Sequence, residues 1–233
     1  LAVDWGGRLC DYRRLSQFGV PIIQDAAHSL LAEPEAQPSY RCWSLGPIKH
    51  LSTPSAGMLA VPEAQHEQAK RLRWYGLNRE SNIDFRAKQD ISSEAVGYRY
   101  ISDDVTAALA LANMEAVQSI VDRHRENAAY YRERLKGHPY MGVPQSNPTS
   151  AWWLYTVQVR GRSEFIAHMH NRGAVVSQVH RRCDMHSCFS PFRTSLPGVD
   201  RFASQNAAIP VHAGLSDEDR ERVADAALDW RGA

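Results

Sequence analysis

The chain has 233 residues, with 27 lysines and arginines against 26 aspartates and glutamates, so its formal net charge is +1 with histidine counted as neutral. A balance this close to neutrality argues against a protein built to bind nucleic acid or an anionic membrane. Hydrophobic residues make up 43% of the chain and charged residues 23%, as in folded domains that bury a core. We therefore expect a globular protein that has neither nucleic acid nor a membrane as its partner.

The N-terminal sequence and the cysteines indicate the compartment. No stretch reaches the roughly 18 apolar residues that a membrane span requires, and Asp4 and Arg8 stand where a signal peptide would be apolar. Four cysteines are few for this length, which favours a reducing cytoplasm over secretion. The chain begins at Leu1, and its first residues read as the middle of a fold, so we expect that an N-terminal portion precedes it.

Short apolar runs alternate with turns and polar helical stretches over the first 62 residues, which is typical of an α/β layer. The expected strands cover residues 1–3, 20–23, 40–45 and 57–61, and a helix is expected over 11–19. A second helix is predicted over 63–76, followed by an extended loop over 78–96.

The apolar spacing over 102–136 predicts either two helices or one long bent helix, with Ser102 and two aspartates at its start and Gly137 at its end. A Pro-, Ser- and Asn-rich segment at 142–150 suggests a boundary, so we expect one domain over 1–137 and a smaller one over 142–233. The second domain is predicted to contain, in order, a strand at 152–159, a helix at 163–173, a strand at 174–179, an irregular stretch to about 208, and a helix at 217–230 capped by Ser216.

Two side chains in the first domain point to chemistry. Asp25 ends an apolar strand, and ligands bind α/β sheets at the carboxyl ends of their strands. Asp25 by itself could equally be a helix cap. Lys49 lies between Pro47 and Pro54 in a loop that joins two strands, surroundings more restricted than a lysine that serves only solubility requires.

Several motifs, in order along nearly the whole chain, carry a family resemblance. They are DAAH at 25–28, the five-residue spacing from Ser44 to Lys49 with a following Gly57, and the segments 71–80, 97–115 and 124–137. The chain resembles the DegT/StrS-type sugar aminotransferases, which depend on pyridoxal phosphate. The resemblance implies a partial fold-type-I large domain, with a mostly parallel sheet and helices, and a smaller C-terminal α+β domain.

The resemblance assigns roles to five residues. Lys49 would form the Schiff base with the cofactor and act as acid and base, while Asp25 would keep the pyridine nitrogen protonated. His28 would approach the ring or its phenolic oxygen, and Ser44 would donate to the phosphate. Arg99 stands where much of the family has an asparagine that reaches the phosphate of the neighbouring subunit's cofactor. As alternatives, His28 is a core histidine, Ser44 a turn residue and Arg99 the partner of a surface acid.

The resemblance also implies the reaction. An amino acid, usually glutamate, would give its amino group to the cofactor, which would pass it to a keto-sugar carried on a nucleotide. The assembly would be a homodimer with shared active sites. Two alternatives stay open: a sugar dehydratase, in which histidine replaces the Schiff-base lysine, and a catalytically silent truncated homologue that only dimerises. The family's phosphate-binding glycine loop belongs upstream of Leu1, so it is not among these residues.

A histidine and cysteine cluster in the second domain allows two interpretations. His180, Cys183, His186 and Cys188 fall within nine residues, and these are zinc-ligand types. Structural zinc sites space their ligand pairs further apart, so we assign no metal. By resemblance, His180 is a candidate substrate contact.

Overall fold

The computed structural model describes residues 1–77, 96–145 and 147–232. Two compact units make up the chain. The first contains Leu1–Asp4 and Leu9–Val117, and the second contains Trp5–Arg8 and Gln118–Ala233. The division therefore falls ahead of the Pro- and Asn-rich segment at 142–150, and each unit is described by itself.

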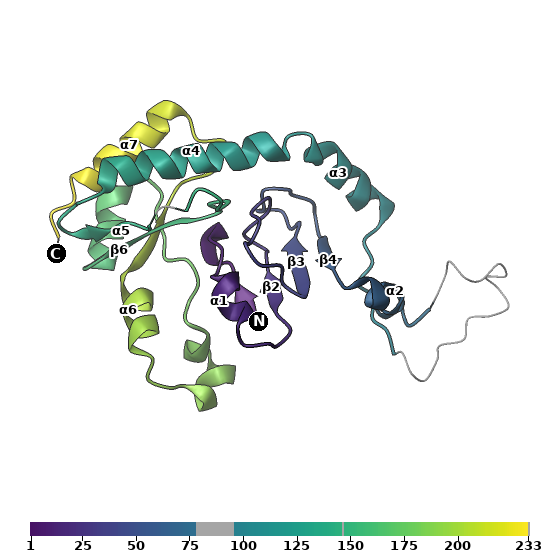
Figure 1. Ribbon diagram of the computed structural model, residues 1–233. Coiled ribbons are helices and arrows are strands. Elements are labelled where there is room, and N and C mark those ends of the chain that lie inside the picture. The colour runs from purple at the N-terminus through teal and green to yellow at the C-terminus, as the bar shows by residue number, and fades with distance from the viewer. Residues whose placement is uncertain (78–95, 146, 233) are drawn as a thin grey trace. The chain divides into compact units, whose positions relative to one another are not determined.

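A four-stranded sheet organises the first unit (Figure 1). Its strands are β1 (Ala2–Val3), β2 (Ile23–Asp25), β3 (Tyr40–Ser44) and β4 (Gly57–Ala60), and they lie in that order. β1 and β3 both run parallel to β2, whereas β4 runs antiparallel to β3. The α/β class with a mostly parallel sheet is therefore confirmed.

Two helices of the first unit begin where a side chain satisfies a free backbone N–H group. Asp11 accepts a hydrogen bond from Arg14 N at 2.9 Å, and Asp103 accepts one from Thr106 N at 2.7 Å. These contacts start two helices; the helical segments of the unit are α1 (Tyr12–Ser16), the 3₁₀ turn η2 (Glu63–Gln65), α2 (His66–Arg73) and α3 (Asp104–Met114). Of the loop predicted over 78–96, all but Val96 lies outside the described residues.

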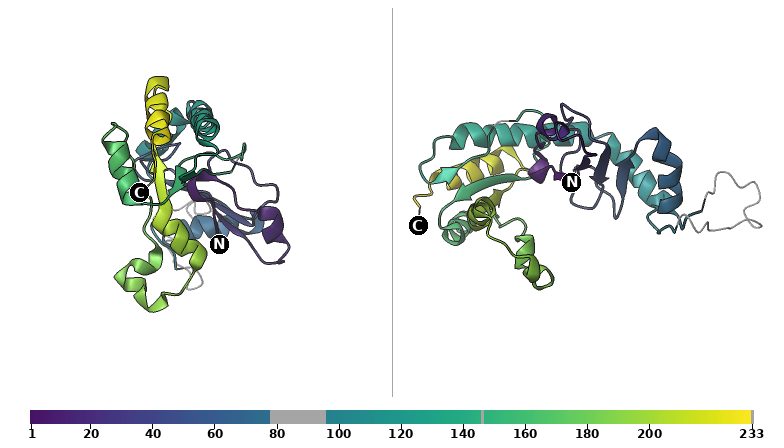
Figure 2. Two further views of the ribbon diagram at one scale, coloured as in Figure 1. Left: turned by 90° about the vertical axis from the view of Figure 1, so that its left-hand side faces the viewer. Right: turned by 60° about the horizontal axis from the view of Figure 1, so that its bottom comes forward.

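The second unit packs helices against an antiparallel sheet in the order β5 (Met141–Gly142), β6 (Tyr155–Val159), β7 (Asn206–Ile209). Its remaining segments are the 3₁₀ turns η1 (Trp5–Gly7), η3 (Cys183–Met185) and η4 (Ser187–Phe192), and the helices α4 (Val117–Leu135), α5 (Arg162–His170), α6 (Pro197–Gln205) and α7 (Asp217–Leu228). Figure 2 shows α7 alongside α4. The core between these elements includes Tyr131, Val157 and Phe165, each 0% exposed.

From residue 102 onward the structure bears out some predicted elements and corrects others. Two helices form over the region 102–136, α4 is followed by Gly137 at φ +76°, and Ser216 caps α7 by accepting from Asp219 N at 3.0 Å. The predicted strand at 174–179 is wrong, because only an isolated bridge between Ser177 and Ala208 forms there. The predicted irregular stretch to about 208 is also wrong, since it contains α6 and β7.

Candidate active site

Two neighbouring strands of the first unit end in candidate residues. Asp25 is the last residue of β2 and Ser44 the last of β3, and Asp25 is in register with Cys42. Side chains alternate between the two faces of a sheet, so Asp25, Cys42 and Ser44 share one face. Asp25 is half-buried, and its Oδ1 accepts a hydrogen bond from Ala27 N at 3.0 Å.

Lys49 lies in the loop that joins β3 to β4, and backbone contacts define this loop. Lys49 N donates to Gly46 O at 3.0 Å, which makes a turn. The loop is closed by Thr53, whose backbone N and Oγ1 each donate to Leu45 O at 2.7 Å. Since Leu45 and Thr53 are each 4% exposed, this closure is buried.

The electrostatics of Lys49 connect it to Asp25. Burial lowers the pKa of the Lys49 amine, because a charged ammonium loses hydration there, and the negative charge of Asp25 acts in the opposite direction. The lowering by burial is the larger effect. Lys49 is therefore an amine that gives up its proton more readily than a lysine in water, within the electrostatic range of a carboxylate.

The other three candidates of the first unit occupy different surroundings. Ser44 Oγ accepts from Gly46 N at 3.3 Å, a contact of the kind found in strand-end turns. His28 is half-buried in the turn that follows β2. Arg99 is exposed on a segment that forms an antiparallel bridge with Trp74, just beyond α2.

Two residues of this region were not singled out by the sequence. Cys42 is one of them, and burial raises the pKa of its thiol, with Asp25 as the second cause. The sequence could have indicated Cys42 through its position two residues before Ser44, which puts both side chains on the same face of the expected strand. Asp4 is the other; it follows the first apolar run and is 0% exposed. Nothing in its own segment marks it as buried.

His180 belongs to the second unit. It is exposed, its backbone has φ +57°, and its ring meets the Trp5 ring edge-on with centroids 4.7 Å apart. Cys183 and Cys188 are exposed free thiols. Across the described part of the chain, no three or more His, Cys, Asp or Glu side chains are grouped so as to hold a metal ion.

The fold and this site define an α/β protein with a carboxylate at the carboxyl end of a strand and, in a neighbouring loop, a half-buried lysine amine whose pKa that carboxylate affects. The chain belongs to the DegT/DnrJ/EryC1/StrS aminotransferase family, whose sequence profile matches residues 1–228. This places the chain among proteins of fold type I.

Three similar proteins illustrate the family. The dTDP-4-dehydro-2,3,6-trideoxy-D-glucose 4-aminotransferase of Saccharopolyspora spinosa is 27% identical over 247 residues, which cover 97% of this chain and 63% of the relative. The UDP-4-amino-4-deoxy-L-arabinose–oxoglutarate aminotransferase of Shewanella sediminis is 26% identical over 252 residues, covering 96% and 65%. The crystal structure of the sugar aminotransferase CalS13 from Micromonospora echinospora is 31% identical, with a TM-score of 0.89, covering 98% of this chain and 66% of that one.

The chain thus spans 63% of the length of the Saccharopolyspora relative. Within residues 1–77, 96–145 and 147–232, no helix has both the length and the apolar character needed to cross a bilayer.

Proposed function

We propose that this chain is the part of a pyridoxal-phosphate-dependent aminotransferase that carries the reactive lysine, and that the enzyme transfers an amino group from an amino acid to a nucleotide-linked keto-sugar. The observation that carries the proposal is the Lys49 amine, whose pKa is lowered by burial while the charge of Asp25 reaches it. Family membership supports the reaction class.

The residues present fit pyridoxal phosphate. The cofactor needs an amine to bond covalently and a carboxylate to pair with its ring nitrogen, and Lys49 and Asp25 supply these. When bound, it would supply an electron sink for the carbon that gains or loses the amino group. Asp25 would orient the ring through a charge-assisted hydrogen bond. His28 in the turn after β2 would contact the ring, and Ser44 at the end of β3 would contact the phosphate.

Lys49 also has the properties of a proton carrier. A free lysine, with a pKa of about 10.4, is almost entirely protonated at neutral pH and is a poor base there. Burial brings the pKa of the Lys49 amine closer to the working range, so that Nζ can take up a proton and return it during one turnover.

The substrates are proposed from the relatives. The names of the two enzymes from Saccharopolyspora and Shewanella specify dTDP- and UDP-linked sugars, and the second also specifies oxoglutarate, the keto acid left by glutamate. We assign glutamate as the donor of the amino group and a nucleotide-linked keto-sugar as its acceptor. His180 would contact this sugar substrate.

A homodimer is proposed from helix α3. Most of its residues are apolar, and Val105, Leu111 and Met114 are 72%, 67% and 53% exposed. An exposed apolar surface of this kind indicates a protein partner. A second copy would cover it, and Arg99 would then reach the phosphate of the neighbouring copy's cofactor. The four free cysteines fit a cytoplasmic protein.

Covalent trapping tests the proposal. The full-length protein is incubated with pyridoxal phosphate, the absorbance of the bound cofactor is recorded, and borohydride reduction is followed by peptide mapping. We expect a single adduct on Lys49, lost in Lys49→Gln and retained in Lys136→Gln, a control at a lysine whose side chain is 67% exposed. An adduct at another lysine, or no adduct, contradicts the proposal; the second outcome favours the silent homologue.

A further inference from the structure

A buried carboxylate lies on the sheet face opposite the candidate site. Asp4 is 0% exposed, and both of its oxygens accept hydrogen bonds. Oδ1 accepts from Cys10 N at 3.0 Å and from the Tyr12 hydroxyl at 2.9 Å. Oδ2 accepts from Gln24 Nε2 at 2.6 Å and from Ser29 Oγ at 2.7 Å. Four donors on one buried carboxylate make this a specific arrangement, because a buried charge is tolerated only when it is hydrogen-bonded.

The two donors on Oδ2 flank the candidate cofactor residues in the sequence. Gln24 directly precedes Asp25, and Ser29 directly follows His28. A backbone hydrogen bond is the third contact with this segment, since Asp4 N donates to Asp25 O at 3.1 Å. One side chain therefore holds both ends of the segment that carries Asp25 and His28.

The loop after β2 needs such support. Leu31 has φ +57°, a left-handed conformation that is unfavourable for a residue with a Cβ atom. A strained residue persists only where surrounding contacts fix it. Here Ser29 holds the loop through Asp4, and Arg41 Nη2 donates to Ala32 O at 3.1 Å from the same sheet face.

We propose that Asp4 is a positioning residue of the cofactor site, which fixes the direction of Asp25 and His28 by accepting from Gln24 and Ser29. The inference rests on the proposed function, because it concerns how those two side chains meet the cofactor. Asp4 itself lies on the other face of the sheet and touches no reacting group. Its effect passes through the backbone of residues 24–29.

The test compares Asp4→Asn with Tyr12→Phe in the full-length protein. Asp4→Asn replaces one acceptor oxygen by a donor and removes the negative charge, so one of the two donor pairs loses its acceptor and the hydrogen bonds of the other pair become weaker. Tyr12→Phe also removes a hydrogen bond to Asp4, but the one that comes from α1 and not from the loop. We expect Asp4→Asn to weaken pyridoxal phosphate binding by about tenfold or more and to move the pH midpoint of the bound cofactor's absorbance. Tyr12→Phe should leave the affinity within about twofold and the midpoint unmoved.

A measurement without cofactor supplies an independent readout. Hydrogen exchange of the backbone amides in residues 26–32 should become faster in Asp4→Asn and in Ser29→Ala, and should stay at the wild-type rate in Tyr12→Phe. Ser29→Ala removes only the loop anchor, so it also replaces Asp4→Asn in the binding test if that variant does not fold.

The outcomes separate the two proposals. If wild-type protein forms the Lys49 adduct and the Asp4→Asn and Ser29→Ala variants bind with wild-type affinity and pH midpoint, Asp4 is only structural and this inference is wrong. If the wild-type protein itself forms no adduct at Lys49, both the inference and the proposed function are overturned.

Discussion

The closure of the Lys49 loop offers a prediction whose size follows from the structure. Leu45 O accepts two hydrogen bonds from Thr53, one from the backbone N and one from Oγ1, both at 2.7 Å. Thr53→Val removes the second and leaves the first, so the buried carbonyl keeps a partner. The expected loss in the free energy of unfolding is therefore that of one hydrogen bond, about 1 kcal/mol, and not the larger penalty of an unpaired buried carbonyl.

Denaturant titration and thermal unfolding measure this loss. For a chain of this size, a loss of about 1 kcal/mol lowers the melting temperature by about 2–4 °C. Thr149→Val is the matched control, since Thr149 is exposed, and it should change the free energy of unfolding by less than about 0.5 kcal/mol. A Thr53→Val variant as stable as wild type would refute the reasoning. So would a loss above about 3 kcal/mol, because it would mean that Leu45 O had lost both donors.

Three further predictions concern other buried or half-buried groups. Asn127→Ala should cost about 2 kcal/mol in denaturant titration, because Nδ2 donates to Val211 O and His212 O, whereas Asn171→Ala at an exposed helix end should cost less than about 0.5 kcal/mol. Burial lowers the pKa of His124, so near that pKa the unfolded chain binds more protons than the folded chain, and the free energy of unfolding should fall as the pH drops below about 6.5. The slope of this fall should be shallower in His124→Gln, and an unchanged slope would refute the reasoning. Burial also raises the pKa of Cys10 to about 11. The rate of Cys10 alkylation, followed by mass spectrometry, should therefore still rise between about pH 9 and 11. A plateau in that range would count against the raised pKa.

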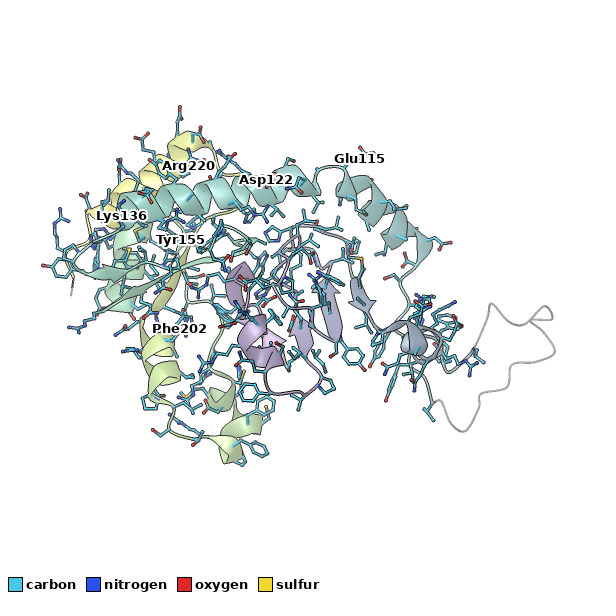
Figure 3. All side chains as sticks on the ribbon, viewed as in Figure 1. Glu115, Asp122, Lys136, Tyr155, Phe202 and Arg220 are labelled. Atoms are coloured by element: carbon cyan, nitrogen blue, oxygen red, sulfur yellow. The ribbon has the colours of Figure 1, made fainter. Side chains whose placement is uncertain are left out.

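Asn127 of α4 is also bonded to Arg220, which Figure 3 labels on α7. Arg220 Nη1 donates to Asn127 Oδ1 at 3.2 Å, so the amide of Asn127 links α4 both to α7 and to the segment that precedes it. Because Asn127 bonds to both segments, the loss in the free energy of unfolding in Asn127→Ala should exceed the loss expected for one hydrogen bond.

The sequence predicts elements well where the signal is local. Asp103 and Ser216 cap helices with residues only three positions away, and Gly137 follows α4 at a positive φ. β3 falls within the strand expected over 40–45 and β2 ends at Asp25, so the sequence alone places the strand ends that carry Asp25 and Ser44.

Elements that depend on distant partners were missed. β7 consists of NAAI, which has too few β-branched or aromatic residues to predict a strand, yet all four residues are buried because β6 pairs with them. Asp4 shows the same limitation at a single side chain. Its donors lie 6 to 25 positions away, so nothing near it in the sequence distinguishes it from a solvent-exposed acid at the end of a strand.

The two faces of β2 explain why these distant contacts matter to the site. Gln24 faces Asp4, and the next residue, Asp25, faces the side of Ser44. A slip of one residue in strand register would exchange the faces and turn the carboxylate of Asp25 toward that of Asp4, where two like charges in a buried setting repel. The same slip would remove the amide of Gln24 from its acceptor. The hydrogen bonds to Asp4 therefore favour the one register that presents Asp25 to the face it shares with Ser44.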